Sequence, residues 1–123
     1  MIFSMESCDD CLLRILVLPN ERVTVEDTMR GIRDRIAADS TARILGEESI
    51  KIAREDGHTL VKEETLGQPA KGPETAGRHV KTRYVTFNHA GDKYYFLLRS
   101  PSNRFPTDDL AFEGLLAKFR FGT

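Results

Sequence analysis

Apolar and aromatic side chains are most concentrated between His79 and Ser100, in two runs on either side of a short connection, Asn88 to Asp92. A connection of this length that contains Gly, between runs of β-favouring residues, is typical of a β-hairpin. We therefore predict strands over about 80–87 and 93–99. The second strand contains consecutive apolar residues, which predicts that it is covered on both sides or lies at the centre of a sheet.

Two shorter apolar runs, residues 1–6 and 12–18, lie at the start of the chain. The segment between them, Ser7-Cys8-Asp9-Asp10-Cys11, is typical of a turn because Asp side chains bond to the nearby backbone. We therefore expect a strand on each side of this turn.

Residues 42–65 alternate between apolar and polar positions around Glu55-Asp56-Gly57. The Asp-Gly pair supplies the positive φ that tight hairpins need, so we predict two strands joined at this point. Charged side chains follow the turn at Lys62, Glu63 and Glu64, and we expect the strand that carries them to be exposed or to lie at an edge of the sheet.

The clearest helix signal follows Thr24, which forms an approximate capping box with Asp27. Its apolar stripe is Val25, Met29, Ile32 and Ile36. We expect this helix to end near Asp39. Gly31 lies inside it, at a cost of about 1 kcal/mol relative to Ala, or marks close packing on the sheet.

A second helix is predicted near the end of the chain. Thr107 is its expected N-cap. Asp108 and Asp109 lie in its first turn, where the helix dipole favours acidic side chains. Its apolar side chains have the spacing of a buried stripe and are Phe112, Leu115, Leu116 and Phe119.

These elements follow the order ββαββββα. They predict an α+β fold, with an antiparallel sheet of five to six strands and two amphipathic helices packed on it, covering one face. A chain of 123 residues can form one core, so we expect a single domain over 1–123. Residues 67–77 hold three Gly and two Pro without a large apolar side chain, which predicts a flexible loop.

Composition narrows the classes of function. Charged residues make up 30% and apolar residues 40%, and no apolar run approaches the roughly 20 residues of a membrane span. The first residues do not resemble a secretory signal, so we expect a cytoplasmic protein. The net charge of −1 disfavours charge-driven binding to nucleic acid. Residues 67–123 carry 9 basic and 5 acidic side chains, which predicts a basic side.

Cys8 and Cys11 form a C-x-x-C pair. In thioredoxin-like proteins such a pair opens a helix, whose N-terminus lowers the pKa of the thiol, whereas here a strand is predicted to follow. A turn with incidental thiols is the favoured interpretation, and a small thiol redox protein is an alternative.

The three histidines, His58, His79 and His89, are predicted at exposed turns and strand ends. No metalloprotease, nucleophile-elbow or phosphate-loop pattern is present in the sequence. We therefore expect no catalytic residue, no cofactor and no metal.

Basic and aromatic residues of the central hairpin offer another alternative. If they share one face of the sheet, the bases of single-stranded nucleic acid could stack on the aromatic rings of that face while the basic side chains contact the phosphates. More often such residues belong to the solvated face of a sheet. The set is Arg78, Lys81, Arg83, Tyr84, Lys93, Tyr95 and Arg99.

Three segments resemble the PsbP-like superfamily: Asp56-Gly57-His58, the run from Tyr95 to Pro101, and Lys118-Phe119-Arg120-Phe121. This superfamily includes photosystem II extrinsic proteins, DcrB-type bacterial proteins and chaperones associated with type VI secretion effectors. The end of the chain is most similar to the secretion chaperones. Two features depart from the family pattern, since the chain has no Trp and its loop at 67–77 looks longer than usual.

The resemblance implies a non-enzymatic domain that binds another protein, through an apolar groove that shields a hydrophobic segment. We therefore predict an adaptor or chaperone-like protein that recognises its partner through one face of the sheet. The candidate contact residues are Tyr84, Tyr94, Tyr95 and Arg99, because aromatic and Arg side chains contribute most to interfaces. The sequence leaves open which of them point outward. An exposed edge strand could also pair two copies of the chain.

Overall fold

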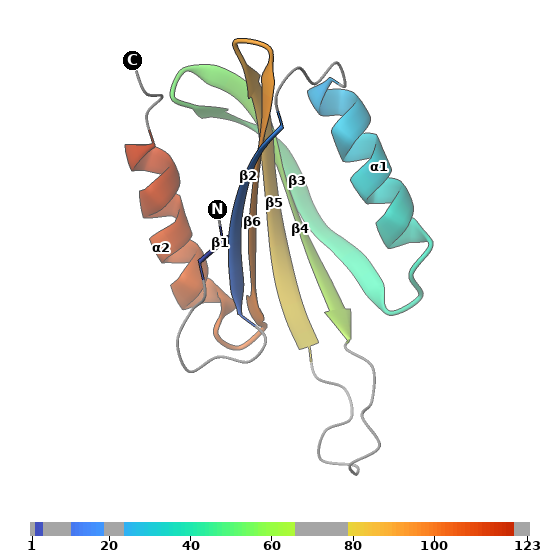
Figure 1. Ribbon diagram of the computed structural model, residues 1–123. Helices are drawn as coiled ribbons and strands as arrows, with labels where there is room; N and C mark the ends of the chain where they lie inside the picture. Colours follow the sequence, from blue (N-terminus) through green and yellow to red (C-terminus); the bar gives the residue numbers. More distant parts are fainter. Residues whose placement is uncertain (1, 4–10, 19–23, 66–78, 120–123) are drawn as a thin grey trace.

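A computed structural model describes residues 2–3, 11–18, 24–65 and 79–119. Six strands form one antiparallel sheet in the order β1-β2-β6-β5-β4-β3 (Figure 1). The sequence order of the elements confirms the predicted α+β class and the order ββαββββα. The elements are β1 (Ile2–Phe3), β2 (Leu12–Leu18), α1 (Val25–Ala37), β3 (Ala42–Ile52), β4 (Glu55–Thr65), β5 (His79–His89), β6 (Asp92–Pro101) and α2 (Phe105–Lys118).

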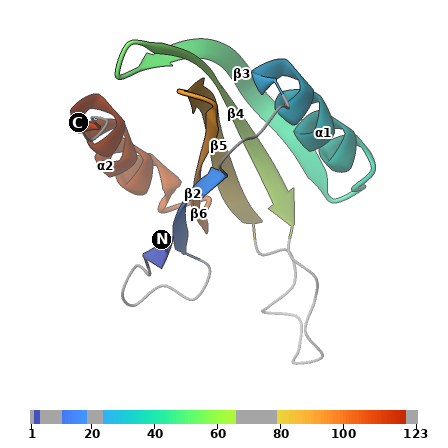
Figure 2. The same cartoon turned by 45° about the horizontal axis from the view of Figure 1, so that its top comes forward.

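The two helices lie on opposite faces of the sheet, so the expectation that both cover one face is wrong (Figures 1 and 2). The reason lies in the strands at the centre. Phe96 and Leu98 of β6 belong to the core under α2, whereas Tyr95 packs against the core under α1. A strand with apolar side chains on both faces needs cover on both sides. β6 lies between β2 and β5, so the prediction of a central position for the second strand of the hairpin is confirmed.

The face under α2 holds the larger core. Phe87 and Phe96 are completely buried there, and Phe119 packs edge-on against both rings. The predicted stripe of α2 is confirmed, since Phe112 and Leu116 belong to this core. The helix itself begins at Phe105 and not after Thr107, and the side chain of its N-cap Arg104 makes no capping bond. Pro106 lies in the first turn, where a missing N–H costs no hydrogen bond.

The face under α1 holds a smaller core, built from Met29, Ile32 and Ile36 of the helix and Leu60 of β4. The predicted helix start is confirmed, because the hydroxyl of Thr24 accepts a 3.0 Å bond from the N–H of Asp27. α1 contacts β3, β4 and β5, whereas α2 contacts β6. Helix α1 therefore lies toward the β3 side of the sheet.

The turn between β3 and β4 differs from the prediction. It is formed by Ala53 and Arg54, both with positive φ (49° and 75°), and Gly57 lies inside β4. A Cβ at Gly57 would lie 2.9 Å from the carbonyl oxygen of Thr86. This glycine therefore allows two strands to approach closely, and it does not form the turn.

β4 lies between β3 and β5, so the prediction that it is an exposed or edge strand is wrong. The edge strand on this side of the sheet is β3, which is exposed along most of its length. The charged residues of β4 pair with near neighbours: Lys62 lies 3.3 Å from Glu64, and Glu63 lies 2.9 Å from Arg43. Ion pairs let a charged segment occupy an interior strand near its end.

Some predictions fall outside the described residues. These are the turn at 7–10, the loop at 67–77, Arg78, and the last residues of the family-like tail. Neither helix of the described part is long and apolar enough to cross a membrane.

Candidate functional site

Within the described residues, α1 covers only part of its face of the sheet. Residues opposite each other in an antiparallel pair point to the same face, and here Arg14 of β2 lies opposite Leu97 of β6, which lies opposite Tyr84 of β5. In the next row, Leu16 lies opposite Tyr95. Helix α1 packs mainly on β3, β4 and β5. On β6, Lys93 bonds to Thr28 of α1 and Tyr95 packs against the core under α1, while β2 lies farther from the helix (Figure 1). We call this face of β2 and β6 the open shelf, formed by Arg14, Leu16, Tyr95, Leu97 and Arg99.

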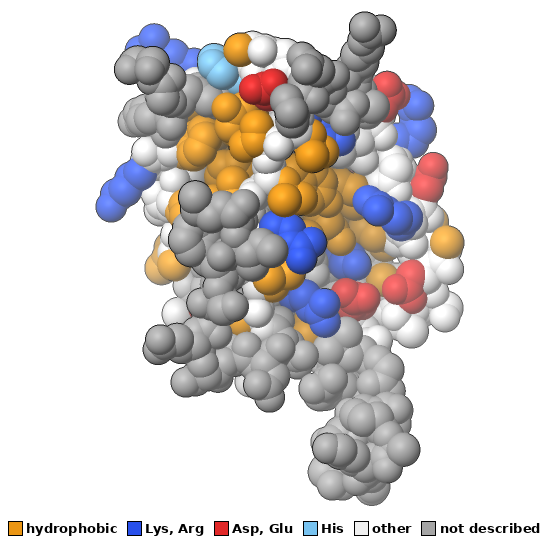
Figure 3. Space-filling model, viewed as in Figure 1, with side chains coloured by type: hydrophobic (Ala, Val, Ile, Leu, Met, Phe, Trp, Pro, Cys, Tyr) orange, Lys and Arg blue, Asp and Glu red, His pale blue; other side chains and the backbone are white. Residues whose placement is uncertain are grey.

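A hollow of about 410 Å³ lies between the open shelf and α1. Its floor is apolar and includes Leu16, Leu97 and Ile36. Basic side chains surround the floor: Arg14 from β2, Arg35 from α1 and Lys62 from β4 also line the hollow. Figure 3 shows apolar side chains gathered between β2 and α1, with Lys and Arg side chains among them.

Two tyrosines form one wall of the hollow. The rings of Tyr84 and Tyr95 pack edge to face with centroids 6.1 Å apart, and the amine of Lys62 lies 5.8 Å above the Tyr84 ring. Burial, together with the neighbouring Tyr84, raises the pKa of Tyr95 to about 12, while the charges of Arg35 and Arg14 act in the opposite direction. Tyr95 is therefore a neutral hydrogen-bonding group beside two guanidinium ions at neutral pH.

The arginines of this region lack partners within the described residues. Arg14, Arg35 and Arg99 form no ion pair there, and the Nε atoms of Arg14 and Arg99 are buried without a hydrogen bond. Lys62 is paired with Glu64. The one carboxylate that lines the hollow, Asp39, accepts bonds from the N–H and hydroxyl of Thr41, which lower its pKa. The hollow is therefore basic.

The predicted contact residues do not all reach this surface. Tyr84, Tyr95 and Arg99 lie on the α1 face. Tyr94 lies on the opposite face, where its ring stacks on Phe87 with centroids 5.1 Å apart.

The predicted single basic and aromatic face is also divided. Lys81 and Arg83 contact Phe105 and Phe112 of α2, whereas Tyr84, Lys93 and Tyr95 lie on the α1 side. The expectation of one continuous strand face for nucleic acid is therefore wrong for the described members.

Sequence reasoning did not select Arg14, Arg35 or Leu97. Arg14 gave a usable signal, because it is the one charged residue in the apolar run LLRILVL. A charge inside such a strand must reach solvent or a partner. Arg35 gave no signal, because it is one of several charged residues outside the apolar stripe of α1.

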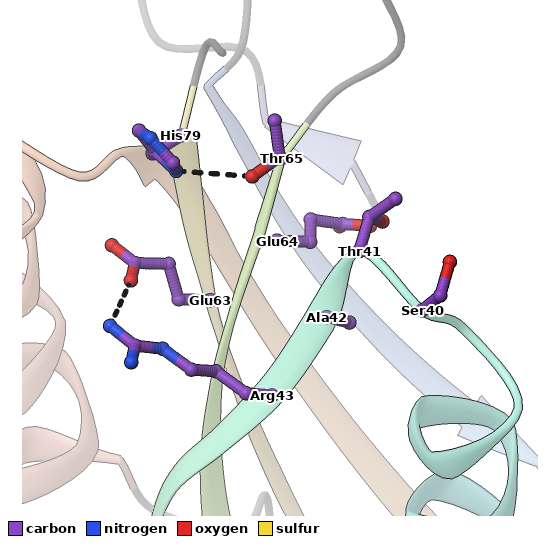
Figure 4. A pocket seen from close by; sticks show the side chains of 8 residues that line it. All are labelled: Ser40, Thr41, Ala42, Arg43, Glu63, Glu64, Thr65 and His79. Atoms are coloured by element: carbon purple, nitrogen blue, oxygen red, sulfur yellow. Dashed lines mark hydrogen bonds and ion pairs between the residues drawn. The ribbon is translucent and has the colours of Figure 1, made fainter.

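A second hollow, of about 220 Å³, lies where β3 begins and β4 ends (Figure 4). Its polar groups are already paired with each other. Thr65 bonds to Nδ1 of His79 over 3.2 Å, and Arg43 pairs with Glu63, whose pKa is lowered by bonds from Ser102 and Arg43. Because these charges are neutralised, this hollow is a weaker candidate for a binding site.

The candidate chemistry of the other singled-out residues is limited. Cys11 is disulfide-bonded, and its Sγ lies 4.0 Å from a carboxylate oxygen of Asp108, while Cys8 lies outside the described residues. His58 bonds to Glu47 over 2.7 Å and His89 bonds to Glu55 over 2.5 Å. Within the described ranges, no group of three or more His, Cys, Asp or Glu side chains could hold a metal ion.

Comparisons with known proteins identify similar folds among solved structures. No family model matches the sequence, and no curated protein matches it. Among solved structures, the chain is similar to PA94 from Pseudomonas aeruginosa, a protein of unknown function, with a TM-score of 0.63 and 10% identity over 100% of this chain and 97% of that one.

It is also similar to cyanobacterial PsbP (CyanoP) from Synechocystis sp. PCC 6803, with a TM-score of 0.58 and 15% identity over 94% of this chain and 69% of that one. At such low identity, these likenesses concern the fold alone. The chain has a PsbP-like fold, and the link to DcrB-type proteins and secretion chaperones stays a prediction.

Proposed function

We propose that this protein is a non-enzymatic binding domain that holds a partner protein on the open shelf and in the adjoining hollow. One observation carries the proposal: aromatic, aliphatic and Arg side chains gather around a hollow between the sheet and α1, beside the part of the sheet that the described helices leave open. Tyr and Arg are the residue types that most often dominate the free energy of protein interfaces. A sheet face beside a helix also gives a rigid platform for an extended or helical segment.

The hollow differs from the purely apolar groove that the family resemblance implied. Leu16, Leu97 and the two tyrosines would bury apolar parts of a partner, while Arg14 and Arg35 stand beside them. A chaperone-like or adaptor role is compatible with this mixture, because interfaces that form and dissociate combine an apolar centre with a polar rim.

The alternatives find less support. Redox chemistry of Cys8 and Cys11 stays a prediction, as does pairing of two copies through an edge strand, for which exposed β3 is the natural candidate. The hypothesis of nucleic-acid binding is weakened, because it needs a continuous basic face and Arg83 is buried against α2.

Site-specific photo-crosslinking in the native host tests the proposal. A benzoylphenylalanine at Leu97 places the reactive group on the open shelf, and the matched control places it at Leu110, which is 74% exposed on α2. We expect discrete protein adducts at Leu97 that are absent at Leu110. Equal labelling at both positions, or none at Leu97, would overturn the proposal.

A further inference from the structure

We infer that the open shelf recognises carboxylate side chains, so that the partner presents an acidic polypeptide segment in which acidic and apolar residues alternate. This inference rests on the proposed function and gives the partner its chemical class. It starts from the charges of the site. Arg14, Arg35 and Arg99 come from three different elements, and none has an ion-pair partner within the described residues.

Two of these arginines have an N–H donor that is buried from solvent. The Nε atoms of Arg14 and Arg99 are buried without a hydrogen bond, and a buried donor that stays unpaired is destabilising. A carboxylate matches the guanidinium fork, because its two oxygens accept two parallel N–H bonds. An incoming carboxylate would therefore pair with guanidinium groups that have no ion-pair partner within the described residues.

A neutral donor lies next to the same arginines. Thr82 of β5 stands directly opposite Arg99 of β6, is 2% exposed, and its hydroxyl has no hydrogen-bond partner. Arg14 lies one row away, opposite Leu97. Arg99 and Arg14 are thus diagonal neighbours on one face, where long side chains can reach a common ligand.

The apolar residues of the hollow indicate which other groups the ligand should carry. Leu16 and Leu97 line the same hollow as Arg14 and Arg35 and would contact an aliphatic or aromatic group. With a volume of about 410 Å³, the hollow has room for a small number of side chains. A segment in which acidic and apolar residues alternate could pair with the arginines and also contact the apolar lining of the hollow.

The opposite face contains an internal example of this recognition. Arg83 of β5 lies on the α2 side, and α2 places Asp109 at 2.9 Å from its Nη1 and Glu113 in contact with the same atom. The Arg83 guanidinium also lies over the ring of Phe112, with 5.5 Å between Cζ and the ring centroid. An acidic helix with an aromatic residue thus docks on an arginine of this sheet.

Single-stranded nucleic acid fits the surface less well. Its bases need free aromatic faces on which to stack. Here Tyr84 and Tyr95 pack edge to face against each other, and Lys62 lies over the Tyr84 ring. The tyrosines therefore favour side-chain contacts over successive base stacking.

The test uses two synthetic octapeptides, acetylated and amidated, which alternate Glu with Phe or Leu in one and Gln with Phe or Leu in the other. They are titrated into the isotope-labelled protein, and the Nε–H signals of the arginines are followed by NMR. We expect the Glu peptide to shift the signals of Arg14 and Arg99 and to bind at least about tenfold more tightly than its Gln twin. Added salt should weaken the Glu peptide selectively.

The variants Arg14→Gln and Arg99→Gln should reduce the difference between the peptides to about twofold or less. The matched control is Arg30→Gln, on the outer side of α1, where Arg30 pairs with Asp27 over 3.2 Å. This variant should leave the difference unchanged. Thermal melts of each variant confirm that the fold persists.

The outcomes separate the two proposals. If crosslinking at Leu97 captures a partner but the two peptides bind equally or not at all, the proposed function stands and the carboxylate inference fails. Tighter binding of an oligothymidine than of the Glu peptide would also overturn the inference, because it assigns the basic groups to nucleic acid. Without adducts at Leu97 and without peptide selectivity, both proposals fail.

Discussion

The two faces of the sheet use arginine in opposite ways. On the α2 face, Arg83 is 5% exposed, its Nε donates to the hydroxyl of Thr59 over 3.0 Å, and its Nη1 contacts Asp109 and Glu113. On the α1 face, the Nε atoms of Arg14 and Arg99 are buried without a hydrogen bond. One face therefore satisfies its charge within the chain, and the other leaves donors for a ligand.

The pKa of Arg83 expresses this difference. Burial lowers it, but the bonds to Asp109 and Glu113 outweigh burial, and the pKa is raised above its ordinary value. A buried cation that its own chain neutralises contributes to the fold, because removing either partner leaves an unpaired charge. Unpaired cations at an open surface contribute little to folding and remain available for binding. The comparison thus separates residues for stability from residues for recognition.

The largest expected effect comes from the packing on the α2 face. Phe96 is completely buried among the rings of Phe87 and Phe119, so Phe96→Ala should lower the free energy of unfolding by about 3–5 kcal/mol. The adjacent Leu97 points to the open shelf, and Leu97→Ala should lower it by about 1 kcal/mol. Urea denaturation measures both. Equal losses would mean that the shelf is part of a sealed core.

The next effect tests the arginines directly. Arg83→Met removes the partner of Asp109 and Glu113 and should lower the free energy of unfolding by about 2–3 kcal/mol, less than for a fully buried pair because both carboxylates are partly exposed. Arg14→Met removes an unsatisfied buried donor and should leave stability within about 0.5 kcal/mol or raise it. A large loss from Arg14→Met, measured by denaturation, would show that this side chain has a structural partner.

A glycine pair sharpens the comparison of packing. Gly57→Ala places a methyl group 2.9 Å from the carbonyl oxygen of Thr86 and should lower the free energy of unfolding by about 1–3 kcal/mol. In the exposed edge strand, Gly46 has no atom within 4 Å of an added Cβ, so Gly46→Ala should change stability by less than about 0.5 kcal/mol. Comparable thermal melts for the two variants would contradict the close approach of β4 and β5.

The smallest effect concerns pH. Burial opposes ionisation of Glu47, but bonds from His58 and Arg33 prevail, and the pKa of Glu47 is lowered from 4.5. A carboxylate with a lowered folded-state pKa stabilises the fold fully above the unfolded-state value, and this contribution is lost as the pH falls through the folded-state pKa.

Stability should therefore decline below about pH 4.5, and Glu47→Gln should reduce that decline by about 0.5 kcal/mol or less. The control is Glu48→Gln, at an exposed position next along β3. Denaturation midpoints measured across this pH range compare the two variants. An identical acid dependence in wild type and Glu47→Gln would contradict the assignment.

Local patterns in the sequence predicted much of the fold. The Thr24 cap, the apolar stripes of both helices and the central hairpin depend on neighbouring residues, and all are present. The placement of one helix on each face was not predicted, although β6 is apolar on both faces and so indicated that both faces need cover. The β3–β4 turn also escaped prediction, since Ala53 and Arg54 adopt positive φ without glycine.

The site was only partly predictable for a similar reason. Tyr84, Tyr95 and Arg99 are conspicuous within the central hairpin. That Tyr94 points to the opposite face, however, depends on the register of the sheet. Arg14 and Arg35 join the site from elements distant in sequence. Such a group becomes visible only when strand order and helix position are known.

The pairing of β2 with β6 has a consequence for biogenesis. Leu12 lies opposite Arg99, so two strands that are far apart in the sequence meet side by side at the open shelf. During synthesis on the ribosome, Arg14 emerges long before Leu97 and Arg99, and the surface that joins them cannot exist until the last strand has been translated. A nascent or truncated chain that stops before β6 would therefore lack this surface.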